Sequence, residues 1–134
     1  MPEHGWTSIG REPFVALTTF RRTGVGVTTP VWIAPDGDAL VVTTEARVGK
    51  VKRLRNDARV TLQPCSRFGK VAPDAPLVHG TAEILGLDRL HPAATTALRR
   101  KYGRQYTVVL AVERVVRRLQ REDPTRVIIR IEPA

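Results

Sequence analysis

The sequence predicts a mainly β protein with a few helices, folded as a small barrel or a curled sheet. Five or six short segments have the composition and alternation of strands, and tight-turn residues separate several of them. Closure into a barrel removes the exposed edges of an antiparallel sheet. The chain has 134 residues with a hydrophobic share of 42%, which suits one core. We therefore expect a single domain over residues 1–134.

Three antiparallel strands are expected near the start of the chain. Residues 14–20 are apolar and β-favouring, and residues 21–24 end in the glycine that a hairpin turn needs. The second strand is expected from Val25 to Ala34 and the third from Ala39 to Thr44. The Asp-Gly step at 36–37 between them is a strong hairpin signal.

The remaining elements alternate between helices and strands. A short helix is expected from Gly49 to Asn56, because apolar residues recur on one face. Proline lies in the first turn of another expected helix, from Leu90 to Tyr102, and glycine follows its end. The valines of residues 108–119 favour a strand, but their spacing fits a helical stripe, so a helix is expected there. The further strands are expected at Arg59–Cys65, Leu77–Leu85 and Arg126–Ile131.

The charge balance indicates an anionic partner. The chain has 22 Lys and Arg against 13 Asp and Glu, a formal net charge of +9 at pH 7. Such a field attracts nucleic acid, an anionic membrane surface or a coenzyme bearing phosphate or several carboxylates. We find no leader-like start and no apolar run of bilayer-spanning length, so we expect a cytoplasmic protein with no membrane span.

No side-chain catalytic apparatus is recognisable. Cys65 is the only cysteine, which excludes an internal disulfide, and three scattered histidines make a metal site improbable. There is no Ser-His-Asp pattern and no pair of carboxylates at a useful spacing. We therefore expect no metal and no catalytic residue, and a bound cofactor would carry any chemistry.

An anion site is expected where the third strand meets the short helix. Thr43 and Thr44 end the strand, and Lys50 and Lys52 lie in the helix that follows. Unpaired N–H groups and the helix dipole favour a negative group at such a junction, and the hydroxyls and cations would complete a phosphate cradle. The alternative is that this stretch is simply a solvated surface.

A second candidate site is the run Thr28, Thr29, Pro30, Val31, Trp32. Proline removes a ladder hydrogen bond from a strand, so Pro30 is expected at an edge, a bulge or a break that faces a ligand. A flat ring could lie against this backbone. Alternatively, Trp32 is a core residue and Pro30 only marks an edge.

These stretches together resemble a known family. The segments FVALTTFRRTG and VTTPVWIAPDGDALVVTTEARVGKVKRLRNDARVTLQPC are similar to the split β-barrel flavin and deazaflavin oxidoreductases related to pyridoxamine-phosphate oxidase. The resemblance covers residues 14–85 well and thins from residue 88. Thr-Pro-Val-Trp and Gly-Lys-Val-Lys-Arg look most similar to the actinobacterial branch that uses the deazaflavin coenzyme F-420.

The resemblance implies a six-stranded antiparallel split barrel that forms a homodimer, with the cofactor in a groove at the subunit interface. It implies an oxidoreductase that transfers a hydride from the reduced coenzyme to a small electron-poor acceptor. The ring and ribityl chain would face the Thr28–Trp32 run. Thr43, Thr44, Lys50 and Lys52 would hold the phosphate, and Arg47 is added beyond the family pattern. Water or Tyr102 could supply the proton that completes the reduction.

The choice of F-420 over flavin mononucleotide (FMN) follows from the excess of cations beyond Lys50, which suits a coenzyme with an oligoglutamate tail. An FMN enzyme or flavin-binding protein on the same fold is the first alternative. A coenzyme carrier without turnover is another. A basic nucleic-acid-binding barrel is also possible, but aromatics are only 5% of residues and none lies among the cations to stack on bases, so we expect no nucleic-acid partner.

Overall fold

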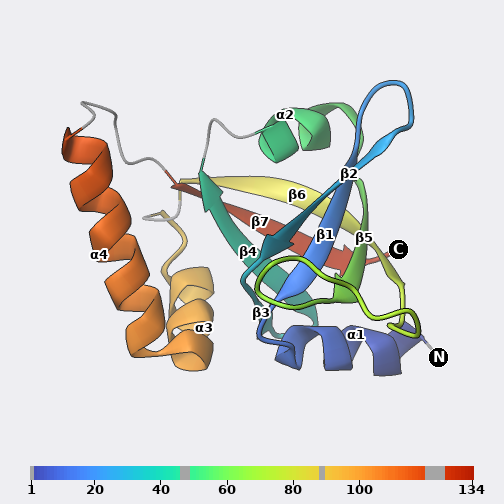
Figure 1. The fold of residues 1–134 in the computed structure, drawn as a ribbon, viewed down its shortest axis with the longest axis horizontal. Coiled ribbons are helices and arrows are strands. Elements are labelled where there is room, and N and C mark those ends of the chain that lie inside the picture. The colour runs from blue at the N-terminus through green and yellow to red at the C-terminus, as the bar shows by residue number, and fades with distance from the viewer. Residues whose placement is uncertain (1, 46–48, 88–89, 120–125) are drawn as a thin grey trace.

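The computed structural model describes residues 2–45, 49–87, 90–119 and 126–134. Its centre is one antiparallel sheet of seven strands that curls on itself (Figure 1). The strands are β1 Val15–Phe20, β2 Gly26–Val31, β3 Ile33–Asp36, β4 Ala39–Glu45, β5 Arg59–Pro64, β6 Val78–Leu87 and β7 Arg126–Pro133. The helices are α1 Pro2–Arg11, α2 Gly49–Asn56, α3 Pro92–Tyr102 and α4 Arg104–Leu119.

The curl of the sheet follows from the order of its strands, which is β2-β1-β5-β6-β7-β4-β3. The two strands at the ends of this order, β2 and β3, follow each other in the chain with only Trp32 between them. The two edges of the sheet must therefore meet at Trp32. The expected curled antiparallel sheet is confirmed, and β2 is an edge strand, as the proline at position 30 predicted.

The expected count of six strands is wrong, because the predicted strand from Val25 to Ala34 is two strands. Its first half pairs with β1, and its second half pairs with β4 starting at Ile33 opposite Val42. The Ile33 N–H donates to the Tyr102 hydroxyl at 3.0 Å. This side-chain bond satisfies the backbone where the chain passes from one edge of the sheet to the other.

Both predicted tight turns are present. Gly24 has φ of 88° in the turn between β1 and β2, and Gly37 has φ of 62° in the hairpin between β3 and β4. Both angles lie in the left-handed region, which glycine enters without steric cost. The turns pair β1 with β2 and β3 with β4, as expected.

Helix α1 was not expected from the sequence. Its residues include two glycines and are weak helix formers, so local propensity gives little signal. Tertiary packing stabilises the helix instead: Ile9 is fully buried, Trp6 is 7% exposed, and the indole N–H of Trp6 donates to the carbonyl of Asp38 at 3.1 Å. The expected helix after residue 108 is confirmed, although α4 begins earlier, at Arg104.

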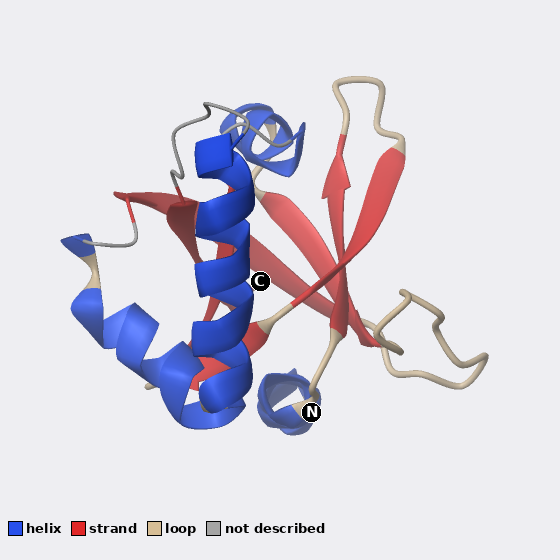
Figure 2. Ribbon diagram, turned by 60° about the vertical axis from the view of Figure 1, so that its left-hand side comes forward, coloured by secondary structure: helices blue, strands red, loops and turns tan. Residues whose placement is uncertain are grey.

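Two hydrophobic clusters hold these elements together. One fills the curled sheet and includes Trp6 and Ile9 from α1 and Leu54 from α2. The other lies where α3 and α4 cover the sheet and includes Tyr106. In Figure 2, α4 stands at the outside of the molecule, alongside the sheet. No helix in the described part of the chain is both long and apolar enough to cross a membrane.

Candidate functional site

A cavity of about 320 Å³ lies where β2 ends, β4 ends, α2 begins and α4 passes by. Strand β2 is one of the two edges that meet at Trp32, and β4 pairs with the other edge strand, β3, so the closure of the sheet creates this position. The lining residues are Pro30, Val31, Trp32, Thr43, Thr44, Glu45, Lys50, Val109, Leu110, Glu113 and Arg126.

Six of the ten residues proposed from the sequence line this one cavity: Pro30, Val31, Trp32, Thr43, Thr44 and Lys50. They come from the two stretches, the Thr28–Trp32 run and the strand-to-helix junction, that the resemblance assigns to one cofactor groove. The fold brings the proline-containing run and the strand-to-helix junction together on either side of one hollow.

The other four proposed residues lie elsewhere or are not described. Thr28 points its hydroxyl at that of Thr18 across the β1–β2 pair, 2.7 Å away, in an exposed position. Thr29 is half-buried on β2, and Lys52 is exposed on α2; neither lines the cavity. Arg47 lies outside the described residues.

The two threonines are held in place by the pairing of β4 with β7. Thr43 faces Ile128 and Thr44 faces Val127 in this ladder. Their exposed fractions are only 6% and 5%, although both line the cavity. Buried hydroxyls at a cavity wall can bind a ligand without first giving up many water contacts.

Arg126 and Glu113 are lining residues that the sequence analysis missed. The guanidinium of Arg126 donates to both carboxylate oxygens of Glu113, at 2.7 and 2.6 Å. Arg126 also donates to the hydroxyl of Thr43 at 3.1 Å and to its carbonyl at 3.2 Å. Both bonds to Glu113 come from Nη1 of Arg126, and this ion pair fastens α4 to the wall of the cavity. One feature of the sequence could have drawn attention to Glu113: it is the only acidic residue in α4.

Lys50 is the cation that remains available. It is half-buried and makes no hydrogen bond or ion pair to any residue that the structure describes. Burial lowers the pKa of Lys50, and the charges of Arg53 and Arg126 lower it further. A bound anion would offset the effects of burial, of Arg53 and of Arg126 on the charged form of Lys50. Lys50 therefore gains more free energy from binding an anion than an exposed lysine does.

Trp32 is partly buried, packs against the hydrophobic cluster under α3 and α4, and also lines the cavity. Its ring stacks on Tyr102 with centroids 4.6 Å apart and planes at 11°. The Tyr102 hydroxyl lies within hydrogen-bonding distance of the carbonyl oxygens of Pro13 (2.9 Å) and Ile33 (3.1 Å). Burial raises the pKa of Tyr102 to about 12. Tyr102 is therefore a poor acid, which argues against it as the proton donor.

The cavity lining has polar and charged groups that can bind an anion and apolar groups that can contact a flat ring. Lys50 and the two threonine hydroxyls can bind a phosphate, while Val31, Trp32 and Leu110 offer apolar contact. Glu113 neutralises the charge of Arg126, so the unpaired positive charge in the cavity lining is that of Lys50. The residues present therefore fit a phosphorylated ring compound, and the volume of about 320 Å³ accommodates only part of a large coenzyme.

The remaining chemistry-bearing residues give no second centre. Cys65 is half-buried, and burial raises the pKa of its thiol, so its reactive thiolate form is disfavoured. Across residues 2–45, 49–87, 90–119 and 126–134, no group of three or more His, Cys, Asp and Glu could hold a metal ion.

Comparison with known proteins identifies related sequences and folds. The family model described as pyridoxamine 5'-phosphate oxidase matches residues 3–134. Comparison with curated proteins gives no match.

Among solved structures, an F-420 reductase has a TM-score of 0.61 at 20% identity, covering 97% of this chain and 94% of that one. A putative pyridoxamine 5'-phosphate oxidase from Listeria innocua has a TM-score of 0.57 at 14% identity, covering 98% and 92%. A heme storage protein from Vibrio cholerae has a TM-score of 0.61 at 10% identity, covering 96% and 87%. These structures share the fold with this chain.

Proposed function

Because the chain belongs to the pyridoxamine 5'-phosphate oxidase family, we propose that it is an oxidoreductase that binds coenzyme F-420 in the cavity beside Trp32. Its activity is the transfer of a hydride from the reduced coenzyme to a small electron-poor organic acceptor. The coenzyme, when bound, supplies the hydride. The protein supplies binding, orientation and exclusion of water.

The observation that carries this proposal is the environment of Lys50. A half-buried ammonium with a lowered pKa, and with no hydrogen bond or ion pair to any described residue, lines the same cavity as two buried threonines, Thr43 and Thr44. Maintaining such a group costs stability unless a ligand offsets the cost. Lys50, Thr43 and Thr44 are accordingly assigned to the phosphate.

The ring is assigned to the β2 side of the cavity. Pro30, Val31 and Trp32 form that wall, and the fixed stack of Trp32 on Tyr102 makes it rigid. A preorganised wall orients a ring without paying for side-chain ordering on binding. Thr28 and Thr29 precede this wall on β2 and are assigned to parts of the coenzyme that extend beyond the cavity.

The preference for F-420 over FMN comes from the surface of α2. Lys52 and Arg55 are exposed on this helix, and Arg53 is partly exposed. They continue the positive charge away from Lys50. FMN ends at its phosphate, whereas a tail of several carboxylates would lie along these cations, with Arg47 as a further contact. Each exposed pair adds little, but together they favour the longer anion.

The proposed assembly is a homodimer that completes the coenzyme site. The cavity is too small for the whole coenzyme, and α4, which lines it through Val109 and Leu110, exposes an apolar face. Val108, Val112, Val115 and Val116 on α4 are each between 45% and 59% exposed. A second copy covering this face would remove the valines from water and extend the walls of the cavity.

The test is a titration of the purified protein with oxidised F-420 and with FMN, followed by absorbance and fluorescence. The proposal expects F-420 to bind more tightly than FMN. Tighter binding of FMN would overturn the choice of coenzyme. Oxidation of the reduced coenzyme is then measured with a panel of quinones and enones.

A carrier without turnover is the second candidate function. It is favoured by the state of Tyr102, whose hydroxyl is held in backbone hydrogen bonds behind the ring wall and is a poor acid. Tight F-420 binding with no oxidation across the whole acceptor panel would support the carrier and contradict the enzyme. Tight, strongly salt-dependent binding of single-stranded nucleic acid, with no binding of either coenzyme, would contradict both.

A further inference from the structure

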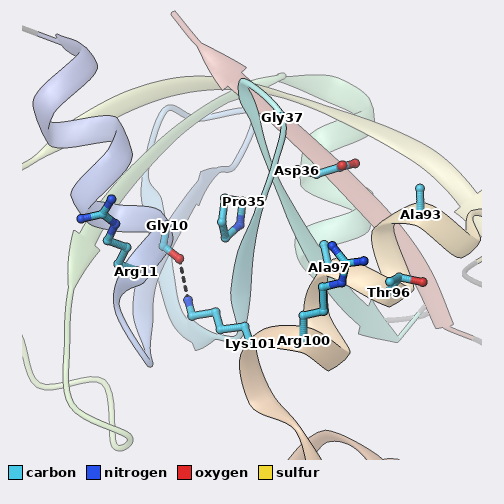
Figure 3. A pocket seen from close by; sticks show the side chains of 10 residues that line it. All are labelled: Gly10, Arg11, Pro35, Asp36, Gly37, Ala93, Thr96, Ala97, Arg100 and Lys101. Carbon is cyan, nitrogen blue, oxygen red and sulfur yellow. Dashed lines mark hydrogen bonds between the residues drawn. The ribbon is translucent and has the colours of Figure 1, made fainter.

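A second cavity, of about 790 Å³, lies on a different part of the molecule from the coenzyme cavity. It is bounded by the end of α1, the β3–β4 hairpin and α3 (Figure 3). Its lining residues are Gly10, Arg11, Pro35, Asp36, Gly37, Ala93, Thr96, Ala97, Arg100 and Lys101, and none of them lines the coenzyme cavity. We refer to this hollow as the α1–α3 groove.

The charge of the α1–α3 groove is positive. Three cations line it, Arg11, Arg100 and Lys101, against one carboxylate, Asp36. Asp36 already has a cationic neighbour, because its carboxylate lies 3.9 Å from the guanidinium of Arg130. The field inside the groove therefore favours an anion.

Lys101 contributes positive charge to the groove but has no N–H donor left for a ligand. Its ammonium donates to the carbonyls of Gly10 at 2.8 Å and Glu12 at 2.5 Å, and to the carbonyl of Ile33. Figure 3 shows the first of these bonds across the floor of the groove. All three donors are in use. The cation is therefore fixed, and it holds α1 against the strand edge.

The two arginines are in the opposite situation. Neither Arg11 nor Arg100 has a hydrogen bond or ion pair to any residue in the described part of the chain. In Figure 3, Arg11 lies on the α1 side and Arg100 on the α3 side, with Pro35 between them. Each guanidinium keeps its fork of donors, whose geometry matches a carboxylate.

Small and apolar groups occupy the space between the charges. Ala93 and Ala97 lie one turn apart on α3, and Pro35 faces them from the hairpin. Larger side chains at the two alanines would fill the hollow. The groove thus offers an apolar surface beside free guanidinium groups, which suits a compact body that carries a carboxylate.

We propose that the α1–α3 groove binds a small organic carboxylate, with Arg100 contacting the carboxylate and the body of the ligand lying on Ala93, Ala97 and Pro35, while Arg11, on the other side of Pro35, adds to the positive field. Aromatic and branched-chain carboxylates are the expected class. This site is separate from the coenzyme cavity, and it does not depend on which coenzyme the protein binds.

The test uses benzoate and phthalate as probes, with benzamide as the neutral counterpart of benzoate and acetate as the carboxylate without an apolar body. Binding is followed by ¹H–¹⁵N NMR of the full chain. Benzoate and phthalate should shift the amides of Gly37, Thr96 and Ala97. Benzamide and acetate should bind at least about 5-fold more weakly, since each lacks one of the two recognised features.

The variants are Arg100→Gln and Arg11→Gln, with Arg99→Gln as the matched control. Arg99 is an exposed arginine on the same helix that does not line the groove. Arg100→Gln should weaken benzoate by about 2- to 5-fold, the range for an exposed charge pair, Arg11→Gln should weaken it by less than about 2-fold, and Arg99→Gln should leave the Kd unchanged. Ala93→Leu, at an exposed position, should block binding without lowering the unfolding temperature.

Three results would overturn this site: benzamide binding as tightly as benzoate, Arg99→Gln weakening benzoate as much as Arg100→Gln, or benzoate shifting no groove amide at millimolar concentration. The first would remove the carboxylate from recognition. The second would mean unspecific attraction by the helix charge. None of them bears on the titration with F-420 and FMN, so the two proposals fail separately.

Discussion

Replacing Lys50 with methionine should weaken coenzyme binding and leave the fold at least as stable as before. Methionine keeps an unbranched apolar side chain but removes the charge. Because burial and the neighbouring arginines penalise the ammonium in the free protein, its removal relieves a cost. A lysine that served the fold would show the opposite effect on stability.

The loss of affinity can be estimated from the bond that disappears. A hydrogen bond between charged partners contributes about 1.5–3 kcal/mol, which corresponds to a Kd about 10- to 150-fold higher. The Thr43 and Thr44 hydroxyls remain in the variant, so binding is weakened rather than abolished. The same factor should apply to FMN and to F-420, since both place a phosphate at this point.

Lys52→Met is the matched control for this measurement. Lys52 lies on the same helix but is exposed and outside the cavity lining. Its removal should raise the Kd for FMN by less than about 2-fold, as expected of an exposed and screened charge. Its effect on F-420 should be larger than on FMN, because only F-420 has a tail to follow α2.

The pH dependence has a definite sign. The pKa of Lys50 in the folded protein lies below its ordinary value of 10.5. Between these two values the unfolded chain binds more protons than the folded chain, so the stability of the wild type rises with pH through that window. Affinity for phosphate falls over the same range, because the ammonium is lost. The Lys50→Met variant should lose the fall in affinity and show a smaller rise in stability, and the rise that remains comes from Lys101, because burial lowers the pKa of Lys101 to about 8.

The assay is fluorescence titration of coenzyme between pH 7 and 10, with thermal unfolding measured on the same samples. An unchanged Kd in Lys50→Met would remove Lys50 from the site. A clearly lower unfolding temperature with reduced affinity would show that Lys50 supports the fold, which would refute the reasoning from its burial.

Three other changes test the surrounding structure. Lys101→Met removes three bonds to backbone carbonyls and should lower the free energy of unfolding by about 2–4 kcal/mol in urea titrations, whereas a loss below about 1 kcal/mol would mean that water replaces the ammonium. Arg126→Gln removes the ion pair with Glu113 and should cost about 1–3 kcal/mol, with faster proteolysis within α4; equal proteolysis would show that the pair does not hold the helix. Val112→Glu, at a position 57% exposed, should convert a dimer into a monomer in sedimentation experiments without lowering the unfolding temperature, and a dimer that persists would place the interface elsewhere.

Much of the secondary structure was predictable because its signals are local. The turn glycines at 24 and 37, the apolar stripe of α2, and the alternation of β5 and β7 each act within a few residues of the chain. Helix α1 lacked such a signal. Its formation depends on burying Trp6 and Ile9 against strands far along the chain, which no window of its own sequence contains.

The candidate site also has features that local sequence predicts and features that depend on the whole fold. The sequence by itself determined the chemistry available at two stretches, a proline-containing strand end and a pair of threonines before a cationic helix. Only the tertiary structure decided that the strand breaks at Trp32 and that Glu113 and Arg126 complete the wall of the cavity that both stretches line. The physical reason is that strands far apart in the chain, such as β4 and β7, are neighbours in the closed sheet. Which side chains then meet depends on strand order and register, and these are properties of the whole sheet.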